Sequence, residues 1–260
     1  MLEALRLGLK LEPVLATSGF LASAPGEEVL ARLPRPPLVA ASRLLDGLAD
    51  ADSPRGLLAV CALPRTGLAG LAPGKPGVWL YLDRIQDPGN LGALARVAEG
   101  LGAAGLLLSP GCADPNHARA LRASAGSLLR LPLAIQVEPA AAREHFAEIP
   151  QRLASQPARS PAPRSAGVRW IGLEAHHGSI RLADLDPAGH GETVIVALGG
   201  EGPGLSAATR AQQDTAVTIP LAGRLESLNV AVAAALVLAR LAPMAPVDPM
   251  APLPLPITPP

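Results

Sequence analysis

Cysteine is scarce in this chain, which has only two in 260 residues. Cys61 and Cys112 lie far apart, and neither stands in a cluster of cysteines and histidines with the spacing of metal ligands. The pair is typical of reduced thiols in a cytoplasmic protein. The sequence therefore predicts neither a disulfide framework nor a metal site.

Long apolar runs are also missing. The nearest candidate, VAVAAALVLARLAP, is interrupted by Arg240 and Pro243, so it predicts a core helix and not a membrane span. The start of the sequence lacks a charged segment followed by an apolar one, and no secretory signal is predicted. We expect a cytoplasmic protein without a membrane partner.

An excess of positive charge is absent as well, since 22 Lys and Arg balance 22 Asp and Glu. Global charge thus gives no support for nucleic-acid binding, and any basic surface must be local. Lys10 and Lys75 are the only lysines. Arginine suits bidentate contacts to phosphate, but the codon usage of a GC-rich genome explains the same bias.

The pattern of the sequence changes along the chain. Residues 1–63 combine a helix-like start, MLEALRLGLK, with the strand-like LEPVLAT and GLLAVCAL, and predict a small α/β domain. Residues 64–76 are dense in glycine and proline and predict a linker. In residues 77–242, the apolar runs VWLYL, GLLLS, LAIQV, VRWIGL and TVIVAL alternate with helix-length segments, which predicts a parallel sheet covered on both faces. The segment 152–167 and the proline-rich tail 243–260 are predicted to be disordered.

The first candidate site follows the first predicted strand. There, DPGNLGALARVAEGLG places Asn90 and Arg96 at a strand-to-helix junction, where parallel sheets bind ligands beyond the carboxyl ends of their strands. Helical spacing puts Gly92, Arg96 and Glu99 on a different face from the apolar residues. Arg96 thus need not point into the core, although an ordinary solvated arginine explains the same position.

The second candidate site is ALGGEGPGLS, an apolar strand end followed by a loop of glycines and a helix start. Such glycines let the backbone approach a ligand closely, and a helix start offers free N–H groups. The spacing is not G-x-G-x-x-G and the loop comes late in the chain, which argues against a dinucleotide fingerprint. Glu201 would repel a pyrophosphate, so a ligand with a positive or neutral centre fits better.

The third candidate site, IPLAGRLESLNVAVAAAL, contains Ser227 and Asn229 on either side of Leu228, before a long alanine-rich helix. Each is a good helix-capping residue. Capping does not explain why two such residues flank one leucine.

Taken together and in this order, the three segments resemble the SpoU/TrmH family of RNA ribose 2′-O-methyltransferases, within the knotted SPOUT superfamily. The segment ALRASAGSLLRLPL matches the family pattern between the first and second motifs, and the resemblance covers Val78 to Leu241. It implies an α/β domain with a parallel sheet and a C-terminal trefoil knot, a rare exception to unknotted topology. The first sixty residues resemble, more weakly, the family's ribosomal-protein-like substrate-binding domain, and an earlier part of that domain is absent here.

The resemblance implies S-adenosyl-L-methionine as the cofactor, with no metal, and assigns residues to three roles. Cofactor contacts would come from Gly199, Ile219, Leu228, Leu198, Gly204 and Leu221. The catalytic set would be Arg96, Asn90, Glu201, Ser227 and Asn229. Candidate contacts to RNA phosphates are Arg84, Arg122 and Arg130, together with Arg32, Arg35 and Arg43 near the N-terminus, although an ordinary surface charge is the simpler explanation for any one of them.

Arg96 is a poor base, because its guanidinium is effectively always protonated. A more economical role is to bind an RNA phosphate and stabilise the developing 2′-oxyanion, while that phosphate or a water takes the proton. The hypothesis is thus a homodimeric enzyme that methylates a ribose 2′-hydroxyl in RNA. The N-terminal domain favours ribosomal RNA over tRNA, and the reaction itself implies RNA.

Three alternatives stay open at this point. One is methylation of a base by the same fold, which Ser227 to Asn229 and Arg96 disfavour. Another is a non-catalytic RNA-binding or assembly protein that keeps the fold, which the zero net charge and the short N-terminus permit. A nucleotide-binding dehydrogenase is disfavoured by the missing dinucleotide fingerprint.

Overall fold

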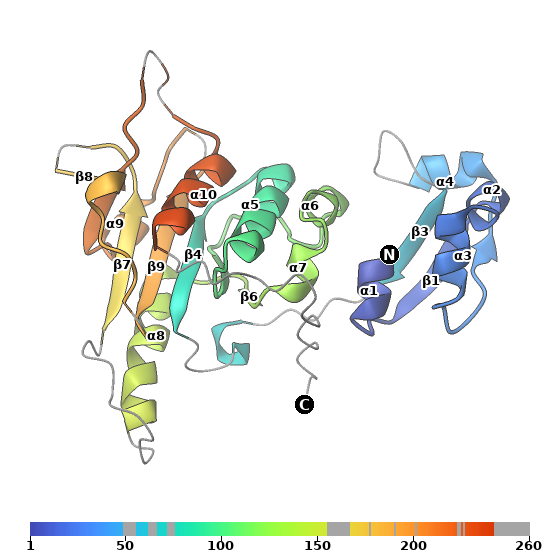
Figure 1. Ribbon diagram of the computed structural model, residues 1–260, viewed down its shortest axis with the longest axis horizontal. Coiled ribbons are helices and arrows are strands. Elements are labelled where there is room, and N and C mark those ends of the chain that lie inside the picture. The colour runs from blue at the N-terminus through green and yellow to red at the C-terminus, as the bar shows by residue number, and fades with distance from the viewer. Residues whose placement is uncertain are drawn as a thin grey trace. The chain divides into compact units, whose positions relative to one another are not determined.

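The computed structural model describes residues 1–48, 56–61, 67–71, 76–154, 167–176, 178–189, 191–200, 202–222, 225 and 227–241, without the side chains of 148–154. Between Pro64 and Arg65 the chain divides into two compact units (Figure 1). The predicted tail and most of the predicted linker and of the segment 152–167 lie outside the described residues. Residues 152–154, however, end a helix, because the apolar and polar periodicity before them continues to Ala154.

The first unit is built on a sheet of three strands in the order β2-β1-β3. β1 runs parallel to β2 and antiparallel to β3. Its core contains Val14, Val29 and Leu45, which come from one strand and two helices. The strands are β1 (Leu11–Ala16), β2 (Leu38–Val39) and β3 (Leu57–Cys61), and the helices are α1 (Leu2–Arg6), α2 (Ser18–Leu21), α3 (Ala24–Leu30) and α4 (Ser42–Leu48).

The second unit contains a sheet of seven strands in the order β6-β5-β4-β9-β7-β10-β8, all parallel to their neighbours. The predicted α/β class with a parallel sheet is therefore confirmed. The strands are β4 (Gly77–Asp83), β5 (Gly105–Leu108), β6 (Leu133–Ala134), β7 (Val168–Leu173), β8 (Ile180–Arg181), β9 (Thr193–Gly199) and β10 (Thr215–Thr218).

Helices cover both faces of this sheet, because alternate residues of its central strands are buried on opposite sides. In β4, Leu80 and Leu82 join the core under α5 and α10, whereas Trp79 and Tyr81 join the core that contains Phe146 of α8. The helices are α5 (Pro88–Gly100), α6 (Ala118–Ala123), α7 (Ser127–Arg130), α8 (Pro139–Ala154), α9 (Ala207–Arg210) and α10 (Val230–Leu241), with short 3₁₀ helices η1 (Leu68–Gly70) and η2 (Leu182–Asp184).

The structure corrects three details of the sequence analysis. The predicted strand LAIQV pairs only over Leu133–Ala134, since Gln136 has a left-handed backbone with φ of 55°. β8 and β10 are additional strands, too short for an apolar pattern to reveal. Gly92 does not share an open face with Arg96 but is buried against α6, where a Cβ would overlap the carbonyl oxygen of Ala120.

None of the described helices is long and apolar enough to span a bilayer.

Candidate functional site

A cleft of about 320 Å³ opens where β4 and β9 end. Its volume falls in the range of small-molecule sites, about 300–1,000 Å³. The two strands are neighbours in the sheet, so the loops that follow them meet at one carboxyl edge. The lining residues are Arg84, Ile85, Gln86, Asp87, Asn90, Gly200, Pro203 and Val230.

The first and third motifs meet at this cleft through their asparagines. Asn229 Nδ2 donates a hydrogen bond of 2.9 Å to Asn90 Oδ1, across 139 residues of sequence. Each asparagine is also held by a helix start. Asp87 Oδ1 accepts from the Asn90 N–H at 2.8 Å and caps α5, and Asn229 Oδ1 accepts from the Ala231 N–H at 3.0 Å and caps α10. The two amide groups are therefore fixed on rigid elements.

The second motif forms the opposite wall as a glycine loop, defined here as residues 199, 200 and 202–206. The loop closes on itself, since Gly200 pairs with Gly204 and a Cβ at Gly199 would overlap the carbonyl carbon of Gly204. A Cβ at Gly200 would lie 2.8 Å from the carbonyl oxygen of Arg84. Close backbone contact thus requires glycine at 199 and 200. Glu201 lies outside the described residues.

The other residues assigned by resemblance surround the cleft less closely. Leu198 is buried in the sheet core, and Ile219, Leu221 and Leu228 are half-buried without lining the cleft. Ser227 is exposed and makes no hydrogen bond with a described residue, so of the two expected capping residues only Asn229 caps α10. Their roles toward a cofactor stay predictions.

Arg96 is exposed on α5, almost two turns beyond Asn90, and does not line the cleft. Within the described part of the chain it has no hydrogen-bond or ion-pair partner. Its guanidinium is therefore free to bind an anion that comes from outside this unit.

The three arginines predicted to contact RNA have different surroundings. Arg84 lines the cleft, and its Nε lies 3.4 Å from Asp83 Oδ1. Arg122 is exposed on α6. Arg130 donates two hydrogen bonds to Glu99, at 2.5 and 2.6 Å, and these bonds lower the pKa of the Glu99 carboxyl group.

Several residues at the cleft were not singled out in the sequence. Gln86, Pro203 and Val230 line it, and Arg119 reaches its rim through an ion pair of 3.2 Å with Asp87. Asp83 is 2% exposed at the end of β4. A carboxylate at the end of an apolar strand is the sequence signal that could have pointed to Asp83.

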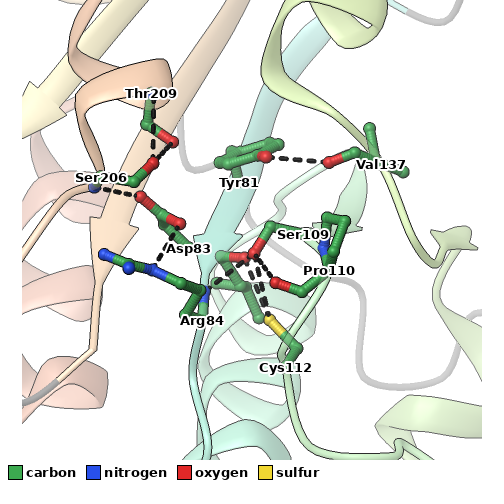
Figure 2. A network of polar contacts seen from close by, with 10 residues as sticks. Tyr81, Asp83, Arg84, Ser109, Pro110, Cys112, Val137, Ser206 and Thr209 are labelled. Carbon is green, nitrogen blue, oxygen red and sulfur yellow. Dashed lines mark hydrogen bonds and ion pairs between the residues drawn. The ribbon is translucent and has the colours of Figure 1, made fainter.

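A network of polar contacts lies behind the cleft, around a smaller cavity of about 130 Å³ (Figure 2). Tyr81 donates from its hydroxyl to the Val137 carbonyl at 2.8 Å, and burial raises the pKa of this phenol. Burial also raises the pKa of the Cys112 thiol, whose Sγ donates to the Leu82 carbonyl at 3.1 Å. Both groups are therefore neutral near pH 7.

No group of three or more His, Cys, Asp or Glu residues in the described ranges is arranged to hold a metal ion. Glu174 accepts a hydrogen bond of 2.7 Å from Arg210 Nε.

Comparison of this chain with known proteins identifies its relatives. Residues 77–239 match the model of the SpoU rRNA Methylase family. An uncharacterized tRNA/rRNA methyltransferase of Mycobacterium tuberculosis is 33% identical over 183 residues, 70% of this chain and 57% of the relative. The chain thus spans little more than half of the length of the curated relatives that it matches.

Several solved structures are similar over 92% of this chain, among them the following two. One is the SpoU methyltransferase AviRb from Streptomyces viridochromogenes in complex with AdoMet, with a TM-score of 0.75, 28% identity and 84% of that chain covered. The other is an RNA 2′-O ribose methyltransferase, with a TM-score of 0.69, 27% identity and 83% of that chain covered.

Proposed function

Because this chain belongs to the SpoU rRNA Methylase family, we propose that it is an RNA methyltransferase that transfers a methyl group from S-adenosyl-L-methionine to a ribose 2′-hydroxyl, with ribosomal RNA as its substrate. The observation that carries the proposal is the Asn90–Asn229 hydrogen bond of 2.9 Å beside the glycine loop. It brings all three motifs to one cleft from separate parts of the sequence.

The residues of the cleft suit S-adenosylmethionine. Ile85, Pro203 and Val230 offer apolar surface for a flat purine, and the Asn90 amide offers a polar contact. The carboxylate of Asp87 favours a ligand that carries positive charge. Glycine at 200 leaves the backbone open to close approach.

S-adenosylmethionine supplies an activated methyl group on a sulfonium, so the transfer is an in-line displacement in which the attacking oxygen forms the new bond as the bond from carbon to sulfur breaks. The protein's task is to hold the acceptor in line and to stabilise the oxyanion. Arg96 fits the second role, because it is exposed and free of partners among the described residues. An RNA phosphate or a water takes the proton.

Arg96 does not line the cleft of its own chain. A bound RNA that contacts Arg96 and also reaches a bound cofactor therefore needs another part of the assembly. We propose that this part is a second copy of the chain. Val232 and Leu236 of α10 are 50% and 42% exposed and lie one turn apart, which supports an apolar face for self-association. The C-terminal trefoil knot is proposed with the family.

The first unit is proposed to bind ribosomal RNA. The candidate phosphate contacts of this unit are Arg32 and Arg35, which pair with Glu28 and Glu12 at 3.0 and 3.4 Å, and Arg43, which is exposed. Such exposed pairs are weak, so a phosphate competes with the carboxylate for the guanidinium.

The test incubates the protein with labelled S-adenosylmethionine and either ribosomal RNA that lacks its methyl groups or tRNA. We expect label on a 2′-oxygen of ribosomal RNA. Label on tRNA would show that tRNA, and not ribosomal RNA, is the substrate. Label on a base would show that the methyl acceptor is not the ribose 2′-hydroxyl. Cofactor binding without any transfer would favour the non-catalytic alternative, and the absence of cofactor binding would refute the proposal.

A further inference from the structure

Asp83 is a buried carboxylate that the proposed chemistry does not use. It is the last residue of β4 and is 2% exposed, at the boundary between the cleft and the smaller cavity behind it. A charged carboxylate is retained at such a position only when several donors satisfy it. Its partners therefore indicate what it does.

The donors of Asp83 come from two walls of the cleft. Its Oδ2 accepts a hydrogen bond of 2.6 Å from the backbone N–H of Ser206, 123 residues away, at the end of the glycine loop. Its Oδ1 lies 3.4 Å from Arg84 Nε. Figure 2 shows both contacts converging on the one carboxylate. The backbone oxygen of Asp83 also accepts from the Gly200 N–H at 3.1 Å, so the loop is tied to Asp83 at both of its ends.

Arg84 is held in an uncommon conformation beside this carboxylate. Its φ of 55° is left-handed, which costs free energy for a residue with a Cβ. The Arg84 N–H donates to Ser109 Oγ at 2.9 Å, and its carbonyl oxygen packs against Gly200. The backbone is thus fixed on both sides, and the ion pair with Asp83 holds the guanidinium of a residue that lines both cavities.

We propose that Asp83 is the positioning residue of the site: through Ser206 and Arg84 it sets the glycine loop and the guanidinium against the cleft in which S-adenosylmethionine binds. The effect on cofactor affinity rests on the proposed function, whereas the effect on the loop does not. Asp83 acts through its partners and needs no contact with the reacting atoms.

The amino edge of the same sheet offers a matched control. Glu192, just before β9, also accepts from a backbone N–H, that of Gly189 at 2.7 Å, and pairs with Arg169 at 3.0 Å. It lines neither the cleft nor the smaller cavity. Glu192→Ala therefore removes the same kinds of bonds without touching the site.

The test is amide hydrogen exchange, residue by residue, with titration of S-adenosylmethionine, on the full chain. In Asp83→Ala we expect about tenfold faster exchange of the Ser206 amide and about tenfold weaker cofactor binding, because the bond from Ser206 to the carboxylate is lost, whereas the Gly200 amide keeps its backbone acceptor. Asp83→Asn keeps an acceptor for Ser206, so we expect about threefold changes. Glu192→Ala leaves both quantities at the wild-type values.

Ser206 provides a second route if Asp83→Ala does not fold. Its φ of −70° suits proline, so Ser206→Pro removes the N–H while Asp83 stays in place, and Ser206→Ala removes only the hydroxyl that caps α9. We expect weaker cofactor binding in Ser206→Pro than in Ser206→Ala.

The proposal is overturned if Asp83→Ala changes exchange and affinity no more than Glu192→Ala does, or if Ser206→Pro and Ser206→Ala bind alike. If the wild-type chain binds no S-adenosylmethionine, the proposed function fails, and the exchange of the Ser206 amide alone still decides whether Asp83 holds the loop.

Discussion

The two edges of the parallel sheet carry similar carboxylates in different settings. Glu192 at the amino edge is 18% exposed in its side chain and bonds to Gly189, three residues earlier. Asp83 at the carboxyl edge is 2% exposed and bonds to Ser206, 123 residues later. The hydrogen bond of Glu192 thus fastens local structure, whereas that of Asp83 joins distant motifs around a cleft.

The direction of the strands explains this difference. All seven strands end at the same edge, so the loops that follow them converge there and offer a ligand several independent walls. The two ends of α5 differ in the same way. Asn90 in its first turn lines the cleft, whereas Glu99 in its last turn pairs with Arg130. Substitutions at the two edges are therefore expected to have different consequences.

The largest effect is expected from Arg96→Ala. Turnover falls about 100- to 1,000-fold while affinity for S-adenosylmethionine is unchanged, because Arg96 is outside the cleft and stabilises charge only when RNA is bound. Single-turnover methyl transfer and a cofactor titration measure the two quantities. Arg181→Ala, which breaks an exposed pair with Asp184, is the control. Full turnover in Arg96→Ala would show that the carboxyl edge alone supplies the chemistry.

Gly199→Ala ranks second. The new Cβ overlaps the Gly204 backbone, so we expect a loss of about 2 kcal/mol in the free energy of unfolding and weaker cofactor binding. The control at the other end of the unit is Gly100→Ala, whose Cβ meets no atom within 4 Å and which is expected to change stability by less than about 1 kcal/mol. Urea denaturation compares them. Equal stability of the two variants would contradict the close contact in the glycine loop.

Asn229→Asp is expected to weaken cofactor binding about five- to tenfold, since a carboxylate cannot donate to Asn90 Oδ1. The cap of α10 survives because Asp still accepts from the Ala231 N–H. Asn229→Ala loses both bonds and costs about 1 kcal/mol more in stability. Isothermal titration and thermal unfolding separate the two effects, and unchanged affinity in Asn229→Asp would remove the Asn90 contact from the site.

The smallest effect is expected from the Glu99–Arg130 pair near the amino edge. The pKa of Glu99 is lowered in the folded state, so its contribution to stability is present above the ordinary pKa of about 4.3 and is lost as the pH falls through the lowered value. Glu99→Gln should destabilise the chain by less than about 1 kcal/mol at pH 7, and this effect should shrink as the pH falls through the lowered pKa of Glu99. Urea denaturation at both pH values tests this.

Arg130→Ala addresses the same pair from the RNA side. If Glu99 keeps Arg130 as a structural partner, the salt dependence of RNA binding stays at the wild-type slope. If the slope of log K against log salt concentration is instead reduced by about one unit, Arg130 contacts an RNA phosphate.

The sequence alone determined the elements and the motifs. Continuous apolar runs predicted the buried strands β4, β5, β7 and β9, because strands covered on both faces need apolar residues on both sides. Asn90, Asn229 and the glycines were found for the same local reason, since strand ends, caps and tight loops impose recognisable residue types.

The tertiary structure decided which of these residues meet. Residue spacing within one helix placed Asn90 and Arg96 together, but only the packed chain shows Asn90 in the cleft and Arg96 outside it. Only the packing of α5 against α7 pairs Arg130 with Glu99, and only the order β4-β9 brings Ser206 to Asp83. The physical reason is that local propensities act over a few residues, whereas such contacts depend on burial and pairing between segments that lie 31 to 123 residues apart.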